Sequence, residues 1–153
     1  MIHLPPSIPK KRRKRLHHLL NNPHEGELEF KYNPQLAYVK RVFHPLAKYS
    51  SNCHGTIAFL CGVGEYPSGL LWKEILPLLK QSSGLQIDSV VAFYSDENLL
   101  QTIHSGLIVG ENHQIFHQRD TGGIFELSTL EEEIERLEEI NKCDIHTQSY
   151  EIR

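Results

Sequence analysis

Residues 52–62 read Asn52-Cys53-His54-Gly55-Thr56-Ile57-Ala58-Phe59-Leu60-Cys61-Gly62, and the rest of the chain is organised around them. They predict a short helix, because Ser50, Ser51 and Asn52 are residue types that start helices and an apolar run follows. Cys53 would then lie in the first turn, where the helix dipole favours a thiolate. Gly55 lets another segment or a substrate approach this turn closely. The alternative is an ordinary buried thiol, since free cysteine is among the most buried residue types.

Length and composition indicate one domain with a real core. The chain has 153 residues, 39% of them hydrophobic and 23% charged, and its net charge of -3 predicts no general attraction to nucleic acid or membranes. Three cysteines, Cys53, Cys61 and Cys143, fit a reducing compartment better than a disulfide scaffold. Neither a signal peptide nor a bilayer-spanning stretch is recognisable. We therefore expect a cytoplasmic protein, or one exported by a route without an N-terminal signal peptide.

Three segments follow from the patterning of the chain. Residues 1–30 contain prolines and six consecutive basic residues, Lys10 to Arg15, without sustained periodicity, and they predict a flexible arm. The basic run suits RNA, DNA, anionic lipid or a nuclear address, but we favour a solvated charged arm. Residues 31–140 are expected to form the catalytic domain, and residues 141–153 a loose C-terminal tail.

The periodicity within the chain predicts an α+β fold. Helices are expected at 34–43 and, with Ser68 as the cap, at 70–76, and a last helix begins at Ser128 or Thr129 with a capping box. The apolar stripe of that last helix comprises Leu130, Ile134 and Leu137, and its glutamates form mostly a solvated face. Four extended runs are expected, at residues 87–94, 102–109, 114–118 and 124–127.

Two of these runs form a predicted hairpin that carries two histidines. A two-residue turn at Gly110-Glu111, or a four-residue loop from Gly110 to His113, would place each position i opposite position 221 − i. In that register His104 faces His117 directly, on the same side of the sheet. Gly106 would keep the surroundings of His104 small.

A thiol at a helix start and a histidine pair on neighbouring strands are the parts of a cysteine nucleophile site. Cys53 would attack the substrate, His104 would act as general base, and His117 would hold the imidazole of His104 in the correct tautomer. Each histidine taken alone is equally typical of a satisfied core or surface residue.

Four segments, taken in their order along the chain, resemble motifs of the NlpC and p-sixty cell-wall hydrolases, which are papain-like cysteine peptidases. These segments are Asn52-Cys53-His54-Gly55, residues 88–94, His104-Ser105-Gly106-Leu107-Ile108-Val109-Gly110 and Ile115-Phe116-His117. The resemblance covers about residues 50–127. It implies a nucleophile helix packed with other N-terminal helices on a central antiparallel sheet. It also implies Cys53 as nucleophile, His104 as base and His117 as third member. The order is that of the unpermuted group, since the lecithin:retinol acyltransferase-like proteins place histidine before cysteine.

The resemblance implies hydrolysis of a peptide or amide bond through a thioester acyl-enzyme. The family commonly has Asp-Cys-Ser-Gly at the nucleophile where this chain has Asn52-Cys53-His54-Gly55, and it usually acts outside the cytoplasm on peptides with D-glutamate and diaminopimelate. Peptidoglycan-type peptides are therefore one expected substrate class. An acyltransferase or deamidase, such as a delivered effector, and a phage lysin are alternatives. A catalytically inactive module that binds through the basic arm is another.

A metal site is a further alternative. Histidine and cysteine are common zinc ligands, and the candidates here are His44, Cys53, His54, Cys61, His104, His113 and His117. Neither a Cys-x-x-Cys nor a His-Glu-x-x-His spacing occurs among them. We therefore expect neither a metal nor an organic cofactor.

Overall fold

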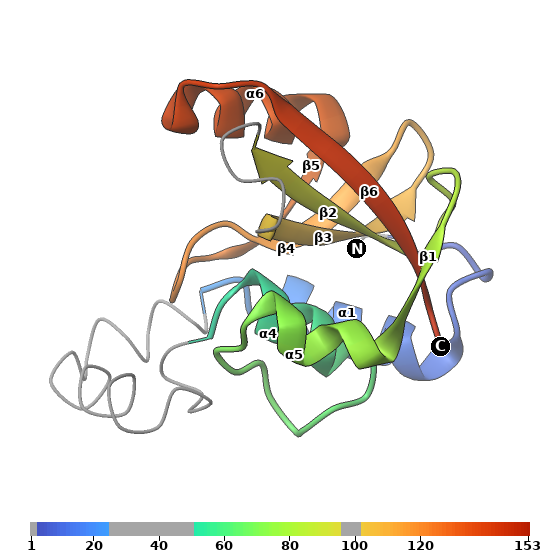
Figure 1. Ribbon diagram of the computed structural model, residues 1–153. Coiled ribbons are helices and arrows are strands. Elements are labelled where there is room, and N and C mark those ends of the chain that lie inside the picture. Colours follow the sequence, from blue (N-terminus) through green and yellow to red (C-terminus); the bar gives the residue numbers. More distant parts are fainter. Residues whose placement is uncertain (1–2, 25–50, 96–101) are drawn as a thin grey trace, which may run out of the picture.

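The computed structural model describes residues 3–24, 51–95 and 102–153. This part of the chain contains four α-helices and a six-stranded antiparallel sheet (Figure 1), so the α+β prediction is confirmed. The strand order is β1-β6-β2-β3-β4-β5. The strands are β1 (Leu79–Ser82), β2 (Ser89–Ser95), β3 (Thr102–Gly110), β4 (Gln114–Gln118), β5 (Phe125–Thr129) and β6 (Ile145–Ile152).

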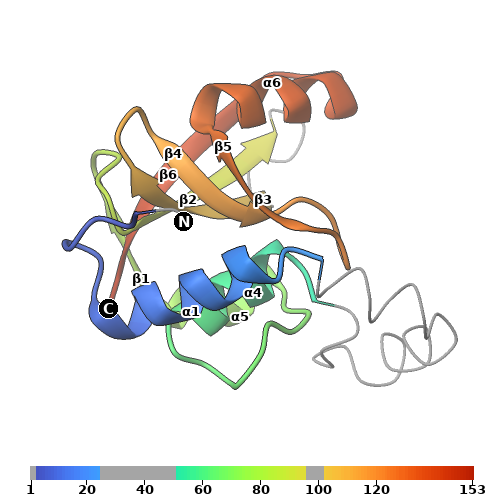
Figure 2. The same ribbon diagram turned by 180° about the vertical axis from the view of Figure 1, so that it is seen from behind.

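The helices divide between the two faces of the sheet. α1 (Lys10–Asn21), α4 (Cys53–Leu60) and α5 (Trp72–Ile75) lie on one face, and α6 (Leu130–Asn141) lies on the other, as Figures 1 and 2 show from opposite sides. Each face has its own core, because side chains alternate across a strand. Leu107 of β3 packs with α1 and α4, whereas its neighbour Ile108 packs with α6.

The N-terminal segment is part of the fold, so the prediction of a flexible arm is wrong for residues 3–24. Leu16 and Leu19 of α1 are completely buried and join the core that includes α4. Arg12 contacts both carboxylate oxygens of Asp88, at 2.8 and 2.6 Å, and Arg15 donates to the Phe59 carbonyl at 2.7 Å. Twelve residues of the expected arm therefore form an amphipathic helix, and some of its basic side chains make structural contacts.

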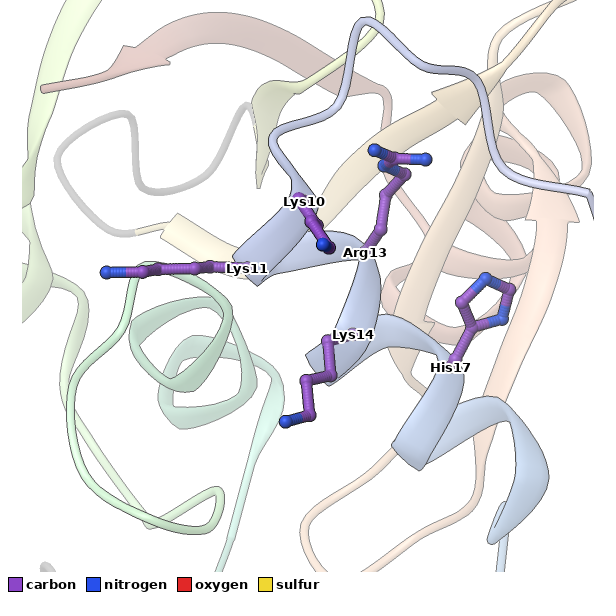
Figure 3. A pocket seen from close by; sticks show the side chains of 5 residues that line it. All are labelled: Lys10, Lys11, Arg13, Lys14 and His17. Atoms are coloured by element: carbon purple, nitrogen blue, oxygen red, sulfur yellow. The ribbon is translucent and has the colours of Figure 1, made fainter.

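The remaining basic side chains of α1 gather on its outer surface. They surround a shallow hollow lined by Lys10, Lys11, Arg13, Lys14 and His17 (Figure 3). Lys11 and Lys14 are exposed, and Arg13 is half-buried. Binding of an anionic partner here stays a prediction that we do not favour.

The C-terminal segment is a strand, so the prediction of a loose tail from residue 141 is also wrong. α6 ends at Asn141, and Lys142 caps it with a left-handed backbone conformation (φ 56°). β6 then runs between β1 and β2, with Ser149 opposite Ser82 on one side and Val91 on the other. The strand β1 was also not predicted from the sequence.

The other predicted elements have mixed outcomes. The four extended runs correspond to β2, β3, β4 and β5, and the capping box of α6 is present between Thr129 and Glu132. The helix expected at 70–76 is shorter: α5 has Leu71 as its N-cap in place of Ser68, and a 3-10 turn, η2 (Leu76–Leu78), follows it. The helix expected at 34–43 lies outside the described residues. Among the helices that the structure does describe, none has the length and apolarity needed to cross a membrane.

Candidate active site

The start of α4 holds the thiol, as the sequence predicted. Asn52 caps the helix by accepting from the Gly55 backbone N–H at 2.8 Å, and its own amide donates to the Leu70 carbonyl at 2.8 Å. The loop after α4 thus folds back on the helix start. Gly55 is required there, because an added Cβ would lie only 1.4 Å from the Ser68 carbonyl oxygen.

The Cys53 thiol contacts His54 and Ser105. Its Sγ lies 3.6 Å from His54 Nδ1, and the same nitrogen lies 2.8 Å from Ser105 Oγ on β3. Burial raises the pKa of Cys53 to about 11, although the backbone and hydroxyl of Ser105 act in the opposite direction. Burial therefore opposes the thiolate that the helix dipole was expected to favour.

His54 is held as a neutral imidazole. Burial lowers its pKa from 6.5 to about 4, and a hydrogen bond to the Thr102 backbone offsets part of this effect. Because Nδ1 faces Cys53 and Ser105, we assign the bond with Thr102 to Nε2–H. Nδ1 then carries the lone pair, which points toward the thiol and the hydroxyl. Trp72 of α5 packs on the His54 ring, with centroids 5.4 Å apart.

The β3–β4 hairpin has a different register from the predicted one. Ile108 pairs with Ile115 and Gly110 with Gln114, which leaves a three-residue loop at 111–113. Val109 is an extra residue in β3 that compensates for the odd length of the loop. From Ile108 back along β3, opposing positions therefore sum to 223 in place of 221. This shift of two residues keeps the side chains there on their predicted faces.

His104 and His117 still meet, across a diagonal. His117 lies beside Gly106, where an added Cβ would come within 3.5 Å of the His117 Cβ. The absence of a side chain at Gly106 lets the two rings approach, with His104 Nε2 3.0 Å from His117 Nδ1. The prediction that these histidines share one face and touch is confirmed, but not the direct pairing.

Acidic and hydroxyl groups complete this second cluster. His104 Nε2 lies 3.5 Å from Glu133 Oε1 of α6, and His117 Nε2 lies 2.9 Å from Ser128 Oγ and 3.6 Å from Glu126 Oε1. Burial lowers the pKa of His117 to about 4, against the nearby charge of Glu126, and lowers that of His104 well below 6.5. Burial thus favours the neutral form of both imidazoles.

The structure thus brings His104 to His117 but does not bring Cys53 to either of them. Ser105 reaches α4 and the thiol, so its neighbour His104 projects from the opposite face, toward α6. His54 is the histidine beside the thiol. Sequence reasoning named His54 only as a candidate metal ligand and missed it as the partner of the thiol, although it follows Cys53 directly. It also missed Glu133, which lies three residues after Leu130 and four before Leu137 and so falls on the buried stripe of α6.

Comparison of the chain with protein-family models, with curated proteins and with solved structures finds no match.

Proposed function

We propose that this protein is a thiol-dependent hydrolase of peptide or amide bonds, with Cys53 as nucleophile and His54 as general base. The contact of 3.6 Å between Cys53 Sγ and His54 Nδ1 carries the proposal. The proposal keeps Cys53, the nucleophile expected from the sequence, and assigns the role of base to His54 in place of His104. The packing of the thiol helix α4 against an antiparallel sheet supports a papain-like fold of the NlpC type.

The chemistry starts from a neutral pair. As Sγ attacks the substrate carbonyl carbon, His54 Nδ1 accepts the thiol proton, and the resulting imidazolium donates it to the departing amine. The C–N bond breaks and a thioester with Cys53 remains, which water then hydrolyses with His54 again as the base. The hydroxyl and backbone of Ser105, which lower the thiol pKa, would stabilise the sulfur anion as it forms.

Cys53 is half-buried as a residue, while its thiol is desolvated enough to raise its pKa. A substrate would reach the thiol at the helix start, where the loop that folds back at Ser68 and Leu70 forms one side. The resemblance to cell-wall hydrolases favours peptidoglycan-type peptides as the substrate. An amine in place of water as acceptor would make the same thioester the intermediate of an acyltransferase.

A panel of peptide-based thiol electrophiles and peptide amides tests this proposal. Wild type should form a covalent adduct on Cys53, read by mass spectrometry, and Cys53→Ala should form none. Cys61→Ala is the matched control, because Cys61 lies at the other end of α4 and burial also raises its pKa to about 11. His54→Ala should lower turnover by ~10²–10⁴. Turnover that survives in Cys53→Ala, or adducts on Cys61 or Cys143, would overturn the proposal.

A further inference from the structure

We infer that His104, His117 and Glu133 bind a Zn²⁺ ion that ties the β3–β4 hairpin to α6. The three side chains have exposed fractions of 3%, 0% and 1% and converge in the layer between the sheet and the helix. Each offers one ligand atom, and these atoms all lie within 4.8 Å of one another. The site is separate from the thiol, and it departs from the expectation of no metal.

The separations fit a tetrahedral ion. Zinc bonds to nitrogen and oxygen are about 2.0–2.2 Å long, so two ligand atoms on one tetrahedral ion lie about 3.3–3.5 Å apart. His104 Nε2 lies 3.0 Å from His117 Nδ1. The Glu133 carboxylate lies 3.5 Å from His104 Nε2 through Oε1 and 3.5 Å from His117 Nε2 through Oε2. A small opening between the two rings would let the ion replace their hydrogen bond.

The two histidines can bind the ion without releasing a proton to the solvent. One of the two facing nitrogens carries the hydrogen of the present bond, and that imidazole must move it to its other ring nitrogen so that both facing lone pairs reach the ion. Glu133 contributes one negative charge, and a water molecule takes the fourth position. Two imidazoles and a carboxylate are ligand types that zinc takes in proteins.

The neighbours of the three ligands suit the same assignment. A metal-bound histidine usually donates its second N–H to an oxygen, and His117 Nε2 lies 2.9 Å from Ser128 Oγ. Arg136 pairs with Glu133, with Nε 2.8 Å from Oε1. Arg136 contacts only Oε1, so Oε2, which lies 3.5 Å from His117 Nε2, is the oxygen left for the ion. Ligands from β3, β4 and α6 would make the ion a stabilising crosslink.

Metal analysis of the purified full chain tests the inference directly. After weakly bound metal is removed and Zn²⁺ is added back, we expect one tightly held zinc ion per chain in wild type. Glu133→Gln should weaken zinc binding at least ~10-fold. His113→Asn, at an exposed histidine in the loop of the same hairpin, should retain wild-type affinity. Cys53→Ala should also retain it, which separates this site from the proposed hydrolase site.

Two further readouts use the wild-type chain, so they stand even where a variant fails to fold. Zn²⁺ at about 100 times its dissociation constant should raise the melting temperature by about 5–10 °C. Co²⁺ in place of zinc should give d–d bands without a sulfur-to-cobalt charge-transfer band. No bound zinc in wild type, zinc lost in Cys53→Ala but kept in Glu133→Gln, or a charge-transfer band would each overturn the inference.

Discussion

His104 and Ser105 are consecutive residues of β3 whose side chains serve opposite faces of the sheet. Ser105 Oγ lies 2.8 Å from His54 Nδ1 of α4, while His104 Nε2 lies 3.5 Å from Glu133 Oε1 of α6. Because side chains alternate between the two faces along β3, these neighbouring residues belong to two separate polar clusters. One cluster contains the thiol, and the other contains the histidine pair.

Acid should destabilise the protein through His54. Because burial lowers its pKa from 6.5 to about 4, the unfolded chain binds a proton between these values that the folded chain does not. The free energy of unfolding should be highest above about pH 6.5 and should fall toward pH 4, by up to roughly 3 kcal/mol from this residue. Urea unfolding at pH ~7, ~5.5 and ~4.5 measures the slope. His54→Gln should reduce the slope by one proton's share, because the buried His104 and His117 still contribute, and His113→Asn should leave it unchanged. Equal slopes in His54→Gln and wild type would speak against a buried neutral His54.

Truncation of a buried α1 leucine should destabilise the whole domain. Leu16 is fully buried in the core shared with α4, so Leu16→Ala should cost about 2–5 kcal/mol in the free energy of unfolding. Lys14→Ala, on the exposed side of the same helix, should change it by less than about 0.5 kcal/mol. Chemical denaturation gives both values. A Leu16→Ala variant as stable as wild type would restore the prediction of a flexible arm.

Proline in β6 should abolish the cooperative unfolding transition. Ser149 pairs with Ser82 of β1 and Val91 of β2, so Ser149→Pro removes a backbone donor inside the sheet. Ser149→Ala is the control, because it keeps the backbone donor and loses only two side-chain hydrogen bonds, one to the Ser82 carbonyl and one from the Ser82 hydroxyl, each worth about 1 kcal/mol. Circular dichroism during heating distinguishes the two. If Ser149→Pro melts like wild type, the C-terminal segment is not an inner strand.

Local chemistry was enough to predict the elements around the thiol and the hairpin. The apolar and β-branched runs of β2 and β3 stand out, and the side chains that cap α4 and α6 are read directly from Asn52 and Thr129. In α1 and β6, which were not predicted, the sequence pattern does not indicate which side chains are buried. The two fully buried leucines of α1 follow the basic run that dominates its composition. In β6, Ile145 is the one residue that is both apolar and buried, so the strand lacks a clear alternation of apolar and polar residues.

Only those features of the site that depend on local sequence could be predicted. A period of two places His104 and His117 on one face in either register, but it does not say which face α4 covers. That choice depends on how the helices pack, and it decided that Ser105, not His104, meets the thiol cluster. The burial that raises the Cys53 pKa to about 11 is likewise a property of the packed domain.

The pH dependence of Cys53 alkylation tests most directly whether His54 serves the thiol. A thiol with a pKa of about 11 that reacts only as free thiolate loses about tenfold in rate for each pH unit below that value. With His54 as base, wild type should instead show a nearly level rate between pH ~6 and ~8, because the imidazole is neutral there. His54→Gln should restore the tenfold slope, and His104→Gln should keep the wild-type profile. A level rate that survives in His54→Gln, or one lost only in His104→Gln, would contradict the assignment of His54 as the base.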